Sequence, residues 1–373
     1  MRDVLDQLVG WWAGGAEVGL ATVVSTWSSA PRQPGASMLV GPDGSAAGSV
    51  SGGCVEGAVY ELATEVRDGA AAVLQRYGVS DDDAFAVGLT CGGILDIFVE
   101  RVGPGSFPEL AEVAEDIRAG RPVAVATVVD APADLLGRRL IVRPERVSGA
   151  LGSERLTDAV RDDARGLLVQ GRTGVLRYGH DGERRVDDIA VFVAAHAPRP
   201  RMIVFGAIDF ASAVARIGSF LGYRVSVCDA RPIFATRRRF PDADEVIVEW
   251  PHRYLASTEV DERTVVCLLT HDPKFDVPLL ELALRMPLAY VGAMGSRRTN
   301  DDRLQRLREL GLTEAELSRL RAPIGLDIGA RTPEETAVSV AAEIIAARWG
   351  GSGSPLRSAG GPIHRAVGAE LFR

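Results

Sequence analysis

The first half of the chain repeats one sequence pattern, and this repeat limits the possible fold more than any other feature. The segment GSVSGGCVEGAV (48–59) resembles GALGSERLTDAV (149–160), and Tyr77 of LQRYG matches Tyr178 of VLRYG, each pair 101 residues apart. Residues 55–69 carry apolar side chains at helical spacing and end at a glycine, which predicts a helix. We therefore expect one supersecondary unit used twice, each copy reading strand, strand, helix, strand.

The first copy carries two glycine-rich cysteine corners that the second copy lacks. Where the first copy has SGGC before the helix, the second has Ser153–Arg155 in place of the two glycines and the cysteine, and the later TCGG segment also has no counterpart. Because the second copy keeps the apolar pattern without these residues, the fold does not require them, which favours a functional role. The candidates are Gly52, Gly53, Cys54, Cys91, Gly92 and Gly93.

The second half of the chain has a different pattern. From Met202 onward, short apolar runs alternate with segments of helical periodicity, which predicts a parallel sheet with helices on both faces. The segment Pro-Arg-Pro at 198–200 predicts a linker, since proline fixes the backbone. The fold class is therefore α/β, an N-terminal duplicated α/β domain followed by a Rossmann-like domain. The expected bounds are 1–195 with repeat halves of about 1–105 and 106–195, then 196–349, and a Gly/Ser-rich tail at 350–373.

Charge and apolar patterning exclude several classes of function. The formal net charge is −8, and this excess of acid repels a phosphate backbone, so we expect no nucleic-acid partner. The sequence shows no secretory signal pattern and no apolar run of roughly 18 residues, so we expect a cytoplasmic protein without a membrane span. The four cysteines are too scattered for a disulfide framework or a zinc site. Cys228 and Cys267 end apolar runs and are expected to be buried strand residues.

The segment VFGAIDFA follows the first strand of the second half, where a dinucleotide-binding fingerprint would lie. Gly206 fits the first position of that fingerprint, and Asp229 lies near the usual place of a ribose-binding acid. Ile208 stands where a glycine normally lets the backbone approach the pyrophosphate. Asp209 adds a negative charge at the helix N-terminus, which competes with an incoming phosphate. The pattern favours a Rossmann-like fold and disfavours NAD(P) binding in the ordinary manner.

Two further loops follow predicted strands of the second half. LLTHDPKFD offers His271 and Asp272, although Asp-Pro is also typical of a simple turn. YVGAMGSRRTNDD offers a glycine, an N-cap serine and two arginines, which suit either a helix start with solvated arginines or an anion pocket. Because ligands bind at the carboxyl ends of parallel strands, these loops predict a cleft at that edge. The candidates in the second loop are Gly295, Ser296, Arg297 and Arg298.

Several long motifs resemble those of the XdhC/CoxI family. They are SAPRQPGASMLV, GSVSGGCVEGAV, TCGG, THDPKFD, YVGAMGSRRT and APIGLDIGARTPEETAVSVAAEIIAAR, and the resemblance covers nearly all of residues 20–105 and 200–348. Members of this family are accessory factors for molybdenum hydroxylases such as xanthine dehydrogenase and carbon monoxide dehydrogenase. The resemblance implies that the chain holds the molybdenum cofactor, protects it while its sulfido ligand is installed, and passes it to the apoenzyme.

The resemblance also implies roles for the candidate residues. We hypothesise that Cys54, with Cys91, contacts the molybdenum, since thiolate is a soft ligand for a soft metal centre. The glycines would let a flat pterin approach the backbone and would present N–H groups to its edges. The loop Gly295–Arg298 would take the phosphate of the pterin. The chain departs from the family pattern at Ile208 and Asp209, where the family has a glycine and a histidine.

Three interpretations of the function stay open at this point. The first is a non-catalytic accessory protein that binds molybdenum cofactor and meets a molybdenum hydroxylase apoenzyme, together with a cysteine desulfurase. The second is an NAD(P)-dependent oxidoreductase that uses the C-terminal cleft, with His271 and Asp272 as its acid–base pair. The third is a duplicated scaffold whose cysteines are inert. A homodimer is the default oligomer in each case.

Overall fold

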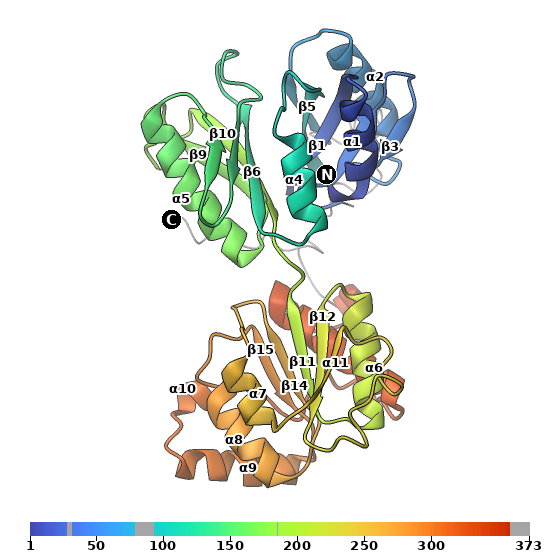
Figure 1. Cartoon of the computed structure of the whole chain (residues 1–373), viewed down its shortest axis with the longest axis vertical. Helices are drawn as coiled ribbons and strands as arrows, with labels where there is room; N and C mark the ends of the chain where they lie inside the picture. Colours follow the sequence, from blue (N-terminus) through green and yellow to red (C-terminus); the bar gives the residue numbers. More distant parts are fainter. Residues whose placement is uncertain (28–31, 79–92, 185, 359–373) are drawn as a thin grey trace. The chain divides into compact units, whose positions relative to one another are not determined.

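The computed structural model describes residues 1–27, 32–78, 93–184 and 186–358 (Figure 1). Contacts divide this part of the chain into two compact units, the first running from Met1 to Pro198 and the second beginning at Arg199.

In the described part of the first unit, the strands form two five-stranded sheets with the same strand order. Neighbouring strands are antiparallel throughout both sheets. The identical order confirms the internal duplication that the sequence repeat predicts. The first sheet has the order β3 (Ala46–Gly48), β2 (Ser37–Val40), β1 (Val18–Trp27), β5 (Ile94–Val102), β4 (Val73–Tyr77). The second has the order β8 (Val147–Gly149), β7 (Arg139–Val142), β6 (Val123–Asp130), β10 (Ile189–His196), β9 (Gly174–Tyr178).

Each copy also contains two equivalent helices. The predicted helix of the first copy is α2 (Glu56–Arg67), and its counterpart is α5 (Glu154–Gln170). A further helix precedes each first strand, α1 (Leu5–Ala13) and α4 (Leu110–Arg118). The predicted strand–strand–helix–strand pattern omitted this helix, and it had three strands per copy where the structure has five. Figure 1 shows α2 and α5 on the outer sides of the first unit.

The two sheets of the first unit share one apolar core. One face of the first sheet packs against α2, and one face of the second packs against α5. The opposite faces meet, because Leu20 and Leu39 of the first copy lie in one cluster with Val125 and Ile141 of the second. Strand residues alternate between the two faces, so each strand is apolar on both. The unit is therefore layered as helix, sheet, sheet, helix.

A buried ion pair joins the two copies inside this shared core. Glu100 of β5 contacts Arg139 of β7, and their side chains are only 10% and 7% exposed. Burial raises the pKa of Glu100, although the neighbouring guanidinium of Arg139 acts in the opposite direction. Arg139 also donates a hydrogen bond of 3.0 Å to the carbonyl of Ser106 and lies 4.5 Å from the ring centroid of Phe107. Arg139 is thus held by several partners away from water, and its guanidinium is the charged partner of Glu100.

One pair of glycines is required by the fold itself. Gly48 and Gly149 are equivalent in the repeat and have φ angles of +82° and +91°. A Cβ atom on Gly48 would lie 2.3 Å from the carbonyl oxygen of Ser37, and one on Gly149 would lie 2.3 Å from that of Arg139. Both copies therefore keep glycine here for steric reasons.

Within its described residues, the second unit contains a six-stranded parallel sheet. Helices α6 (Asp209–Phe220) and α11 (Pro333–Trp349) contribute to the core on one face, and α7 (Pro251–Ser257), α8 (Pro273–Ala283) and α9 (Arg297–Glu309) to the core on the other. This arrangement confirms the Rossmann-like fold class. The strand order is β13 (Glu245–Val248), β12 (Arg224–Asp229), β11 (Arg201–Phe205), β14 (Val265–Leu268), β15 (Tyr290–Ala293), β16 (Leu320–Arg321).

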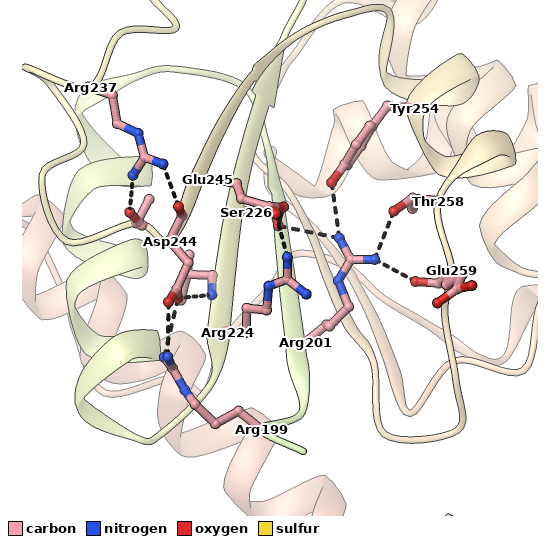
Figure 2. Close-up of polar contacts among 12 residues, drawn as sticks. Arg199, Arg201, Arg224, Ser226, Arg237, Asp244, Glu245, Tyr254, Thr258 and Glu259 are labelled. Atoms are coloured by element: carbon pink, nitrogen blue, oxygen red, sulfur yellow. Dashed lines mark hydrogen bonds and ion pairs between the residues drawn. The ribbon is translucent and has the colours of Figure 1, made fainter. Parts of the chain in front are cut away.

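Arginine side chains bind together the amino ends of these strands (Figure 2). Arg199 holds Asp244 through N–O distances of 2.9 and 3.2 Å. Arg201 donates to Thr258 Oγ1 at 2.8 Å and to the hydroxyl of Tyr254 at 3.0 Å. Contacts that join strands and loops in this way stabilise one edge of the sheet. The opposite edge, at the carboxyl ends, is where such folds bind ligands.

Candidate functional site

The glycine–cysteine corner of the first unit replaces the first turn of a helix. At the repeat spacing of 101 residues, Glu154 corresponds to Gly53, yet α5 begins at Glu154 whereas α2 begins only at Glu56. In the second copy, Ser153 caps the helix by accepting a hydrogen bond from the N–H of Leu156. The first copy lacks such a cap. The SGGC corner is therefore a local departure from a pattern that the fold builds regularly elsewhere.

The carboxylate of Glu56 holds this corner in place. Its Oε1 accepts hydrogen bonds from the N–H groups of Ser51 and Gly52, both at 2.9 Å, and its Oε2 accepts one from Gly53 at 2.8 Å. The hydroxyls of Ser49 and Ser51 donate to it as well. Burial alone would raise the pKa of Glu56, but these hydrogen bonds outweigh it and lower the pKa from 4.5 to about 2. Two glycine N–H groups that we expected to meet a pterin edge thus have a carboxylate as their acceptor.

Cys54 lies between this cradle and the start of α2. Its side chain is half-buried and packs against the core under the helix, and its N–H donates to the hydroxyl of Ser51 at 2.9 Å. Gly52 and Gly53 are exposed, with φ angles of +78° and +118°, and no heavy atom of the described residues lies within 4 Å of the place where a Cβ would be. Their positive φ angles favour glycine, but unlike at Gly48 no neighbouring atom would collide with a side chain there. Among the described residues, nothing covers the backbone at Gly52 and Gly53, so it is accessible to a flat ligand.

We expect the Glu56 cradle to contribute to stability in a pH-dependent way. The variant Glu56→Gln should lower the free energy of unfolding by about 1–3 kcal/mol at pH 7, because three N–H groups lose a charged acceptor. Since the folded pKa of about 2 lies below the ordinary 4.5, the stabilisation is complete above pH 4.5 and is lost as the pH falls toward 2. Urea unfolding at several pH values measures this.

The exposed Glu61 on the same helix provides the matched control for that experiment. The variant Glu61→Gln makes the same chemical change without touching the corner and should have little effect. A difference between wild type and Glu56→Gln that stays constant down to pH 2.5 would contradict the cradle.

The second cysteine corner lies mostly outside the described residues. Cys91 and Gly92 are not described, and Gly93 is buried directly before β5. The pairing of Cys91 with Cys54 at a metal therefore stays a prediction. Among the described residues, no group of three or more His, Cys, Asp or Glu side chains could hold a metal ion.

The two cysteines of the second unit are structural, as the sequence indicates. Cys228 of β12 and Cys267 of β14 are both fully buried. Burial raises the pKa of each thiol to about 12, so both stay protonated at neutral pH.

Every helix in the described part of the chain is too short or too polar to cross a bilayer.

The loop after β11, where a dinucleotide would bind, is hydrogen-bonded to Asp229 at the end of β12. Asp229 is 3% exposed, and its carboxylate accepts hydrogen bonds from the N–H of Ala207 at 2.7 Å and from the N–H and guanidinium of Arg231 at 2.8–2.9 Å. Burial acts to raise the pKa of Asp229, but these bonds outweigh it and lower it. Asp209 begins α6 and pairs with Arg239 at 3.1 Å. A carboxylate occupied in this way has little capacity left for a ribose.

The loop after β14 fits the turn interpretation of its sequence. Asp272 caps α8 by accepting a hydrogen bond from the N–H of Lys274 at 3.1 Å, and the ammonium group of Lys274 lies 3.0 Å away from its carboxylate. His271 is exposed beside it. Gly206 lies against this loop, since a Cβ there would be 2.7 Å from the side chain of Thr270. The structure thus brings the loops after β11 and β14 together.

The loop after β15 leads into α9, which contains the two predicted arginines and a third, buried arginine that the sequence did not single out. Ser296 caps α9 by accepting from the N–H of Thr299 at 3.1 Å, and Arg297 and Arg298 lie exposed in the first turn. Behind them, Arg303 forms a buried ion pair of 2.9 Å with Asp276 of α8. Arg303 stands in an arginine-rich helix, so nothing in the local sequence separated it from its solvated neighbours.

The chain is similar to known proteins over nearly its whole length. The sequence model described as the XdhC and CoxI family matches residues 11–78 and 116–179, and the model of the XdhC Rossmann domain matches residues 202–344. A protein of Bacillus subtilis described as a probable xanthine dehydrogenase subunit is 29% identical over 334 residues, covering 89% of this chain and 93% of its own.

Another relative and a solved structure are also similar to the chain. The Escherichia coli protein named molybdenum cofactor insertion chaperone PaoD is 28% identical over 329 residues, covering 88% of this chain and 83% of its own. A crystal structure described as a xanthine dehydrogenase from Bacillus halodurans has the same fold, with a TM-score of 0.67 at 24% identity and coverage of 95% and 97%. The two family models together match most of the chain and show that it belongs to the XdhC/CoxI family.

Proposed function

We propose that this protein binds the molybdenum cofactor and inserts it into an apoenzyme of the xanthine dehydrogenase type. The names of two relatives support this function, one a molybdenum cofactor insertion chaperone and the other a probable xanthine dehydrogenase subunit. The observation that carries it is the corner at Cys54, where a thiol stands beside two exposed glycines that the second copy of the repeat lacks.

The residues of this corner suit the cargo chemically. Molybdenum bound by dithiolene sulfur is a soft centre, and cysteine thiolate is a soft ligand among protein side chains. Cys54 would hold the metal end, and Gly52 and Gly53 would leave room for the flat pterin. Glu56 would fix the backbone so that the thiol is presented in one position. In the second unit, the loop at Gly295–Arg298 would receive the phosphate of the cargo.

We also propose the form of the cargo, a second partner and the oligomeric state. The cofactor would be delivered in its sulfurated form, with a cysteine desulfurase as a second partner beside the apoenzyme. The protein would work in the cytoplasm as a homodimer and turn nothing over. Cys91, Gly92 and Gly93 would complete the thiol-bearing site.

Thermal-shift titration of the full chain tests this function against the oxidoreductase alternative. We expect purified molybdopterin to raise the melting temperature in a concentration-dependent way, without any chemical turnover. We expect NADH to have no such effect, since Ile208 remains in place of the fingerprint glycine and Asp229 is bonded to Arg231. Stabilisation by NADH together with hydride transfer would reverse the assignment, and no shift with molybdopterin would remove the chaperone function.

A further inference from the structure

Arg303 is the most deeply buried cation near the carboxyl edge of the parallel sheet, among the residues that the structure describes. It is 3% exposed, and one nitrogen, Nη2, donates to Asp276 Oδ2 at 2.9 Å and to the carbonyl of Met294 at 3.0 Å. The other oxygen of Asp276 accepts a hydrogen bond of 2.5 Å from the hydroxyl of Thr270. These contacts fix the guanidinium between the loops that follow β14 and β15.

The remaining terminal nitrogen of Arg303 is the unusual feature. Nη1 is buried and has no hydrogen-bond partner within the described ranges of the chain. It lies 3.7 Å from the point where a Cβ on Gly295 would stand, so it faces the turn that leads into α9. An unsatisfied buried donor on a charged group is costly, and native structures seldom keep one without a reason.

The turn that Nη1 faces is suited to an anion. As the first two residues of a helix of 13 residues, Arg297 and Arg298 carry N–H groups that have no acceptor within the helix. The partial positive charge of a helix N-terminus favours an anion there, and the first turn of α9 contains no acidic residue. Gly295, with a φ angle of +150°, has no side chain, and a Cβ there would lie 3.3 Å from the side chain of Thr299 and 3.7 Å from Nη1.

We propose that Arg303, together with the turn Gly295–Arg298, forms a binding site for the terminal phosphate group of a small molecule. The guanidinium supplies a buried, oriented donor, and Asp276 holds it in place. The helix N-terminus and the two exposed arginines supply further N–H donors and charge. This site rests on the proposed function to the extent that the phosphate of the pterin is one source of the group. A nucleotide phosphate is the other source.

Titration of the full chain with pyrophosphate, at constant ionic strength, tests the site directly. Because Arg303→Gln alone would leave Asp276 buried without its partner, the main variant is the double change Asp276→Asn with Arg303→Gln. A second variant, Gly295→Ala, places a methyl group in front of Nη1 while keeping every charge. We expect both to weaken pyrophosphate binding at least tenfold, as measured by calorimetry.

The control is Arg306→Gln, which removes one exposed charge from the same helix and should change the affinity less than twofold. Pyrophosphate affinity that is equal in wild type and both test variants would overturn the proposal. Failure of the wild type to bind pyrophosphate at millimolar concentration would overturn it as well.

The source of the phosphate is separated by comparing molybdopterin, its dephosphorylated form and ADP on the same proteins. A preference for molybdopterin that disappears in the double variant assigns the site to the cargo. A preference for ADP that disappears in this way supports the phosphate site while the proposed function fails. If molybdopterin binds and neither phosphorylated ligand responds to the variants, the proposed function stands and the phosphate site falls.

Discussion

Replacing Cys54 by serine is expected to lower the molybdenum content of the purified protein by about tenfold or more. A serine hydroxyl is a hard, neutral group, so the soft metal end of the cargo loses its thiolate. A tenfold loss corresponds to about 1.4 kcal/mol of binding free energy, a small demand for one metal–ligand contact. Elemental analysis of protein purified from cells that make the cofactor measures the effect.

The repeat itself provides the control for this variant. Arg155 occupies the position of Cys54 in the second copy, at the same spacing of 101 residues, and is exposed. Arg155→Ser should leave the molybdenum content unchanged. Because the side chain of Cys54 is only half-buried, Cys54→Ser should unfold at nearly the same urea concentration as wild type. Unchanged molybdenum retention in Cys54→Ser would remove this residue from the role.

Replacing Arg139 by leucine is expected to cause a large loss of stability in the first unit. Glu100 would remain in the shared core with its partner gone, and breaking a buried ion pair in this way costs about 3–5 kcal/mol. The contacts of Arg139 with the carbonyl of Ser106 and the ring of Phe107 would disappear as well. Hydrogen exchange of the β1 and β5 amides, followed by mass spectrometry, measures the first unit separately from the second.

A double variant separates the unpaired charge from the loss of packing. Changing both Glu100 and Arg139 to leucine removes the two charges together and should recover most of the lost protection, because apolar replacements of buried ion pairs are often neutral. If the double variant is as unstable as Arg139→Leu, the unpaired carboxylate of Glu100 does not cause the loss of stability, and the loss comes from packing instead.

Patterns that depend on nearby residues were sufficient to predict much of the fold. The repeat indicated the duplicated unit, and the alternation after Met202 indicated the parallel sheet. The face-to-face packing of the two antiparallel sheets could not be predicted from the sequence, because it depends on contacts between residues far apart in the chain. Glu100 illustrates the limit: a single acid in the strand segment IFVERV is typical of a solvent-facing position, and only the opposite sheet explains its burial.

The candidate site was predictable where the two copies could be compared. The asymmetry of the repeat singled out Gly52, Gly53 and Cys54, and both glycines are exposed in the structure. Glu56 stands two residues beyond the cysteine, but its role depends on the loss of one helical turn, which sequence periodicity does not report. Arg303 was missed because its partner Asp276 belongs to another helix.

The layering of the first unit has a consequence for its history. A chain with a single copy would leave the inner face of its sheet bare, and only association with another chain could cover that surface. Fusion of two such chains makes the covering partner permanent and lets each corner change independently. The second copy can then keep the regular helix and cover the apolar core, while the first copy has a shorter helix and a cysteine at the same position.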